Sequence, residues 1–84
     1  MKACITTLPV GTHFLYKQMS WVVVARDEYP FIEAKCETEP NDYEGHNVLF
    51  CNFEQVEVPD NTKLWVSKFV QRGKNYYVRE EVLQ

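Results

Sequence analysis

The chain has 84 residues, of which 45% are hydrophobic and 14% aromatic, and its net charge at neutral pH is −3. This length allows one small domain, residues 1–84, and the apolar content is too high for a disordered chain. The longest apolar run, Trp21 to Ala25, has five residues, whereas a membrane-spanning helix needs roughly 20. Because the segment from Met1 to Gly11 also lacks the apolar stretch of a signal peptide, we expect a cytoplasmic protein without a membrane span.

Charge is distributed unevenly along the chain. The segment from Asp27 to Glu57 contains nine acidic residues and one basic residue, Lys35, which gives it a net charge of −8. The two flanking segments together contain eight basic and three acidic residues, a net charge of +5. Fields of this kind direct the approach of charged partners more than they determine a fold. The uneven charge therefore indicates recognition of a charged partner.

Three strands are predicted in the first half of the chain. His13 to Tyr16 and Trp21 to Arg26 form a candidate hairpin around a turn at Lys17 to Ser20. The second of these strands begins with a tryptophan and three valines, a composition typical of a central strand covered on both faces. Phe31 to Cys36 alternates apolar and polar residues, which predicts a half-exposed strand.

The centre of the chain is predicted to be an acidic loop followed by two short strands. Glu37 to Asn47 contains four acids with a proline, asparagines and a glycine, which is typical of a solvated loop. Val48 to Phe53 has strand composition, but its alternation does not continue into Val56 and Val58. We therefore expect a bulge or a short turn near residues 52–55.

The last segment fits two structures. Leu64 to Gln71 and Asn75 to Val82 form a second candidate hairpin with its turn at residues 72–74, and this is the prediction we prefer. The same apolar residues also fit an amphipathic helix that is capped by Asn61 or Thr62 and ended by the glycine at position 73.

These elements predict a mainly β domain with five to six short strands. The architecture is either a small barrel or a strongly bent antiparallel sheet, with a short C-terminal helix as the alternative for the last segment. The order of a hairpin, a strand, an acidic loop and a further strand resembles that of small SH3-like barrels over Leu8 to Val58. The core is expected to contain the following residues: Trp21, Val23, Ile32, Phe50 and Val56.

Cysteine and histidine do not form a metal-binding pattern. Cys4, Cys36 and Cys51 are odd in number and have no CxxC spacing, so reduced thiols are favoured over a disulfide between Cys36 and Cys51. Structural zinc sites place pairs of ligands two to four residues apart, whereas the closest pair here, His46 and Cys51, is five apart. The other histidine, His13, opens a strand. We expect no metal site.

No catalytic constellation is recognisable either. A nucleophile would need a histidine beside it and donors for a developing oxyanion, and no such group can be assigned around the two histidines. The three glycines are about 30 residues apart, so no glycine-rich phosphate loop is present. Carboxylates in a polar loop are typical of a solvated surface rather than of a dry acid–base pair. We therefore expect no cofactor, no catalytic residue and no enzymatic activity.

Two binding functions remain. The preferred one is a protein that acts as adaptor, regulator or inhibitor and docks a partner with a basic surface through segment 27–57, where aromatic residues supply interface anchors among the acids. The alternative is nucleic-acid binding by the C-terminal hairpin, residues 63–79, which mixes cations with aromatic residues. The candidate residues for the protein partner are Tyr29, Phe31, Glu37, Glu39, Asp42, Tyr43 and Glu44. Those for nucleic acid are Lys63, Lys68, Arg72, Lys74 and Arg79.

Overall fold

The computed structural model describes residues 1–26, 31–51, 54–72 and 75–83, with side chains as far as Trp65. The described elements form two antiparallel sheets and one short 3-10 helix, so the prediction of a mainly β chain is confirmed. In chain order they are β1 (Lys2–Cys4), the 3-10 helix η1 (Ile5–Thr7), β2 (His13–Tyr16), β3 (Met19–Ala25), β4 (Phe31–Cys36), β5 (Val48–Cys51), β6 (Gln55–Glu57), β7 (Leu64–Arg72) and β8 (Asn75–Leu83).

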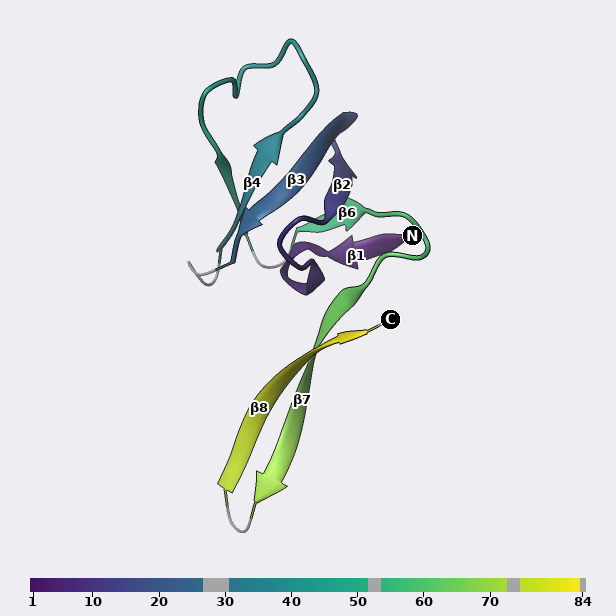
Figure 1. Cartoon of the computed structure of the whole chain (residues 1–84), viewed down its shortest axis with the longest axis vertical. Helices are drawn as coiled ribbons and strands as arrows, with labels where there is room; N and C mark the ends of the chain where they lie inside the picture. Colours follow the sequence, from purple (N-terminus) through teal and green to yellow (C-terminus); the bar gives the residue numbers. More distant parts are fainter. Residues whose placement is uncertain (27–30, 52–53, 73–74, 84) are drawn as a thin grey trace.

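The larger sheet has six strands in the order β1-β6-β2-β3-β4-β5 (Figure 1). Strands β2 to β5 follow one another as a meander, and β6 then returns to the far side of β2. Among the described residues, β1 pairs only with β6 and β5 only with β4. The sheet is therefore open, and a closed barrel, one of the two expected architectures, is not what the described strands form.

The β2–β3 hairpin turns more tightly than the sequence predicts. Tyr16 pairs with Met19, so only Lys17 and Gln18 lie in the turn, with φ angles of 50° and 65°. Two central residues with positive φ match the right-handed twist of a two-stranded ribbon. Met19 and Ser20, which the sequence assigns to the turn, instead begin β3.

A register shift interrupts the pairing of β3 with β4. Val23 pairs with Ala34 and Ala25 with Glu33, so Val24 has no partner of its own. Such a bulge bends the strand that carries it and increases the local twist. β3 is central, as expected, but its Val22 is only half-buried rather than fully covered.

The first strand and the 3-10 helix are not predicted from the sequence. β1 pairs with β6, and the amino group of Met1 donates to the carbonyl of Val58 at 2.8 Å and to Asp60 Oδ1 at 3.0 Å. The hydrogen bond to Asp60, together with the nearby charge of Glu57, raises the pKa of this amino group above its usual 8.0. The start of the chain is thus fixed by residues far away in the sequence.

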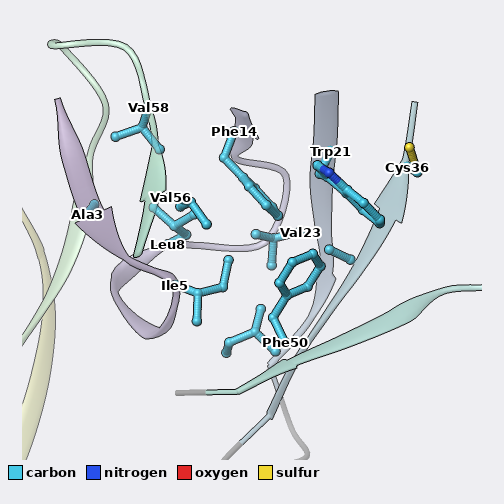
Figure 2. Packing of buried hydrophobic residues seen from close by; sticks show 12 residues of the cluster. Ala3, Ile5, Leu8, Phe14, Trp21, Val23, Cys36, Phe50, Val56 and Val58 are labelled. Carbon is cyan, nitrogen blue, oxygen red and sulfur yellow. The ribbon is translucent and has the colours of Figure 1, made fainter. Parts of the chain in front are cut away.

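The core lies on one side of the six-stranded sheet and includes all five residues that the sequence predicts to be buried. The rings of Phe14, Trp21 and Phe50 point toward one another (Figure 2). Phe50 meets Trp21 edge-on at a centroid distance of 5.0 Å and Phe14 at 5.5 Å. The indole N–H of Trp21 donates to the carbonyl of Tyr16 at 3.2 Å, so its polar group is satisfied inside the core.

The last two strands form a hairpin that extends away from the six-stranded sheet (Figure 1). The register runs without interruption from the pair Leu64 and Leu83 to the pair Arg72 and Asn75. The predicted hairpin is therefore confirmed and the helical alternative is wrong. The turn residues 73–74 lie outside the described residues.

The strand register also decides whether Cys36 and Cys51 are reduced thiols or form a disulfide. Cys51 pairs with Phe31, at the opposite end of β4 from Cys36. With a rise of about 3.3 Å per residue, the two Cα atoms are far beyond the roughly 7 Å that a disulfide can bridge. Cys36 is a buried thiol, and no disulfide joins the three cysteines.

Candidate functional site

The acidic loop, residues 37–47, connects β4 to β5 and is attached to the β2–β3 hairpin. The backbone N–H of Glu37 donates to the carbonyl of Ser20 at 2.7 Å. In return, the N–H of Ser20 donates to the hydroxyl oxygen of Thr38 at 2.8 Å. The first of these hydrogen bonds continues the backbone pairing of β3 with β4 by one step, and both fix the point where the loop begins.

The middle of the loop is held by its own side chains. The amide group of Asn41 donates to the carbonyl of Thr38, and its Oδ1 accepts the backbone N–H of Tyr43 at 2.7 Å. The N–H of His46 then donates to the carbonyl of Tyr43 at 3.2 Å. Asparagine commonly stabilises turns in this way. The loop therefore has a defined shape.

The carboxylates of the loop point outward from this frame. Glu37, Glu39, Asp42 and Glu44, all predicted as partner-binding residues, are exposed. Glu37 differs from the other three because its Oε1 lies 2.7 Å from Nδ1 of His13 on β2. Glu39, Asp42 and Glu44 form no such contact with a histidine, lysine or arginine among the described residues, so they present the most open negative charge.

The structure describes two of the three predicted aromatic anchors, Phe31 and Tyr43, and these two differ in how far they are buried. Tyr43 is half-buried, and its ring packs on Trp21 at a centroid distance of 5.2 Å, so it supports the loop from below rather than projecting from it. Phe31 at the start of β4 is 39% exposed. Tyr29 belongs to the part of the chain, 27–30, that the structure does not describe.

Phe31 and Tyr43 line one groove of about 260 Å³ that the sequence does not predict. Strand β5 forms one side, and the β2–β3 turn lies across from it with Tyr16 and Lys17. At this side the ammonium group of Lys17 lies 5.4 Å from the ring centre of Tyr16, whose hydroxyl donates to Glu54 Oε2 at 3.2 Å. The groove is thus aromatic inside and carries charge of both signs at its rim.

The candidate nucleic-acid site is described only in part. Lys63 is exposed, whereas Trp65 is half-buried with the guanidinium of Arg26 5.6 Å from its ring centre. Lys68 and Arg79 are directly opposite each other in the β7–β8 register. Arg72 is the last residue of β7, and Lys74 lies outside the described residues.

The histidines and cysteines are not gathered into one cluster. Across the described residues, no group of three or more histidine, cysteine or acidic side chains is placed to hold a metal ion. His46 lies edge-on to Tyr43 at 6.2 Å, and His13 contacts Glu37. In the same described part of the chain, no helix has the length and hydrophobicity needed to cross a membrane.

No known protein family, curated protein or solved structure matches this chain. Its function must therefore be inferred from the residues and their geometry.

Proposed function

We propose that this protein is a non-enzymatic binding module that docks a basic protein through its acidic segment, residues 27–57. The observation that carries the proposal is the shape of loop 37–47, which hydrogen bonds hold while its carboxylates remain exposed. A loop that is already ordered loses little conformational entropy when a partner binds. Its role would be that of a cytoplasmic adaptor, regulator or inhibitor.

The charge balance supports a basic partner. Lys35 is the only basic residue in a segment with nine acids. Complementary charge mainly raises the rate of association and suppresses partners of the wrong sign. A lysine- or arginine-rich surface would therefore be selected over an acidic one.

A relationship to small SH3-like barrels is also part of the proposal, since the described strands form an open sheet and not a closed barrel. Phe50 on β5 contacts Tyr16 on β2 edge-on at 5.2 Å, so side chains from non-adjacent strands meet across the concave side of the sheet. An incomplete small barrel has this arrangement. Since one fold hosts many functions, the proposed docking function rests on the loop and not on the resemblance.

Nucleic-acid binding through residues 63–79 remains the second candidate. It is favoured by the β7–β8 register, which aligns Lys68 with Arg79. The surroundings of Trp65 count against it, because a half-buried indole that contacts Arg26 offers less of its ring for stacking on a base.

The test compares two variants with the same change in net charge. The first combines Glu39→Gln, Asp42→Asn and Glu44→Gln in the loop, and the matched control combines Asp60→Asn, Glu80→Gln and Glu81→Gln outside it. A basic partner is isolated on the immobilised protein, purified, and its association rate is measured at several salt concentrations. We expect the loop variant to associate several-fold more slowly, with a flatter salt dependence, and the control to resemble the parent.

The opposite pattern would establish the second candidate. In that case the loop variant keeps its association rate, and reversal of Lys68, Arg72 and Lys74 abolishes binding to an oligonucleotide. The slope of log affinity against log salt would then fall by roughly 0.7 to 0.9 for each phosphate that the protein no longer neutralises.

A further inference from the structure

The groove beside β5 extends to an edge of the six-stranded sheet. It is lined by all four residues of the strand, Val48 to Cys51. Successive residues of a strand point to opposite faces of the sheet, so a groove on one face would be lined by alternate residues only. Since the lining also includes Phe31 of β4 and Trp21 of β3, the groove extends over the sheet surface beside β5 and reaches the edge of β5 that faces away from β4.

The first three residues of this edge, Val48 to Phe50, offer groups for hydrogen bonding. Among the described residues β5 pairs only with β4, and in an antiparallel pair alternate residues direct their N–H and C=O groups away from the partner strand. The carbonyl of Cys51 accepts the N–H of Glu54 at 3.1 Å. Within the described part of the chain, the three preceding residues of β5 pair with no strand on this side.

The composition of β5 is unusual for an edge strand. Edge strands are normally protected against pairing by lysine, proline, a bulge or a covering segment. Residues 48–51 are Val-Leu-Phe-Cys, and their pairing with β4 runs in step without a bulge. Leu49 is 49% exposed, and Phe31 at the start of β4 is 39% exposed. An apolar, regular and open edge of this kind is suited to accept another strand.

The charge around the groove indicates which residues a strand bound there should contain. Glu54 lines the groove, and Glu33 pairs with Leu49 on the neighbouring strand. Asp42 and Glu44 flank the groove residue Tyr43 in the acidic loop. Lys17 is the basic residue in the lining. Pairing β5 with the β5 of a second copy would bring two such acidic rims together, so a basic segment of a different protein fits better.

We infer that the groove binds a short extended segment of the basic partner, which adds to the free edge of β5 as a further strand. Backbone hydrogen bonds to β5 hold the segment, and one apolar or aromatic side chain of the segment enters the aromatic groove between Tyr16, Phe31 and Phe50. Lysine or arginine residues of the segment face Glu54 and the acidic loop. This inference rests on the proposed docking function and defines what part of the partner is recognised.

A displayed library of random peptides, each about eight residues long, tests the inference before the partner is identified. The immobilised protein selects peptides at physiological salt. We expect enriched sequences that alternate apolar with other residues and carry lysine or arginine. Enrichment of acidic sequences, or no enrichment over the uncoated surface, would overturn the inference.

Two matched variants locate the binding site. Leu49→Lys places a charge on the β5 edge, and Leu15→Lys makes the same change at a comparably exposed leucine on β2 that does not line the groove. We expect Leu49→Lys to weaken a selected peptide by about tenfold or more, which corresponds to about 1.4 kcal/mol, and Leu15→Lys to leave its affinity within about twofold. Leu49→Thr, which suits a strand, should also weaken the peptide, and equal binding to all of these variants refutes the site.

Methylation of the peptide backbone tests the strand pairing itself. N-methyl groups on alternate residues of a selected peptide remove its N–H donors while its side chains stay the same. Because only one of the two alternate sets of N–H groups faces β5, we expect methylation of that set to abolish binding and methylation of the other set to be tolerated. If neither set weakens binding, the peptide does not add to the sheet and the inference is wrong. Sedimentation of the protein without peptide provides a further check, because a dimer that Leu49→Lys dissociates would make a second copy the occupant instead.

Failure of this inference can be told apart from failure of the proposed function. If the loop variant slows association of the basic protein and Leu49→Lys does not weaken it, the acidic surface docks the partner but the β5 edge does not. If Leu49→Lys alone weakens it, the edge binds the partner and the acidic loop is not its docking surface.

Discussion

Trp21 is the side chain on which most of the aromatic core converges. Its ring contacts Phe14, Tyr43 and Phe50, and its N–H donates to the carbonyl of Tyr16. Truncation of a buried tryptophan to alanine typically costs about 3 to 5 kcal/mol, which is as large as the whole stability of many domains of this size. We expect Trp21→Ala to unfold the protein at room temperature, as measured by urea titration followed by circular dichroism.

Leu15→Ala is the control for this substitution. Leu15 is 56% exposed on β2, so its truncation should change the midpoint of unfolding little. A Trp21→Ala variant that unfolds at nearly the same urea concentration as Leu15→Ala would show that the aromatic cluster contributes little to stability.

The amino group of Met1 makes stability depend weakly on pH in the alkaline range. Asp60 and Glu57 raise its pKa in the folded state above 8.0. The folded state therefore retains the proton more strongly, so this contribution is present below pH 8 and is lost as the pH rises through the raised pKa. Because the group is exposed, we expect a small decrease in melting temperature, and Asp60→Asn should reduce that decrease while Asp42→Asn leaves it unchanged.

The burial of a side chain could be predicted where it follows from the alternation of apolar and polar residues in the adjacent sequence. It could not be predicted where it depends on contacts with residues far away in the sequence. Ile32 lies on the apolar side of the alternating segment Phe31 to Cys36, and it is buried as predicted. Tyr43 lies among acids and fits an exposed anchor equally well. Its contact with Trp21 arises only when the loop folds back on β3, and nothing in the adjacent sequence indicates this.

At the scale of single elements, the β2–β3 turn carries a conformational cost. Gln18 has a φ of 65°, a region in which residues other than glycine are disfavoured by about 1 to 2 kcal/mol. Gln18→Gly should therefore raise the free energy of unfolding by up to about 1 kcal/mol after allowing for the greater flexibility of glycine in the unfolded chain. Urea titration measures the change.

Gln55→Gly is the matched control for the turn. Gln55 lies in β6, where glycine gains nothing from access to positive φ and weakens the strand. We expect the control to lower stability. If both glycine variants are destabilised equally, the turn is not strained at Gln18.

Strands could be predicted from the sequence where a long segment has strand composition. They could not be predicted where a strand is short and pairs with a strand far away in the sequence. The bounds of β2 and β4 agree with the prediction. β5 ends at Cys51, whose carbonyl accepts the N–H of Glu54, and residues 52–53 of the predicted break lie outside the described residues. β1 has only three residues and is stabilised by β6, so local composition does not reveal it. The groove beside β5 depends on the order of the strands and was not predictable for the same reason.

For the whole molecule, the β7–β8 hairpin is expected to be dispensable for folding. Among the side chains that the structure describes, which end at Trp65, the last buried one is Val58, and Leu64 packs against the core while remaining half-buried. A chain that ends at Thr62 should keep its cooperative unfolding transition with a modest loss of stability, as measured by thermal unfolding. Residues 62–84 alone should be mostly unfolded, because an isolated hairpin is marginally stable at best.

A loss of the cooperative transition in the shortened chain would show that the hairpin belongs to the folding unit. The same shortened chain retains the acidic loop and the β5 edge, so it should bind the basic protein as the full chain does.

The elongated shape separates the two charged parts of the molecule. Figure 1 places loop 37–47 and the β7–β8 hairpin at opposite ends of the long axis, which measures 54 Å. At physiological ionic strength, charges are screened beyond about 8 Å, so the two ends lie several screening lengths apart. A partner that approaches one end therefore experiences the charge of that end. The net charge of −3 describes the electrostatic field at neither end of the molecule.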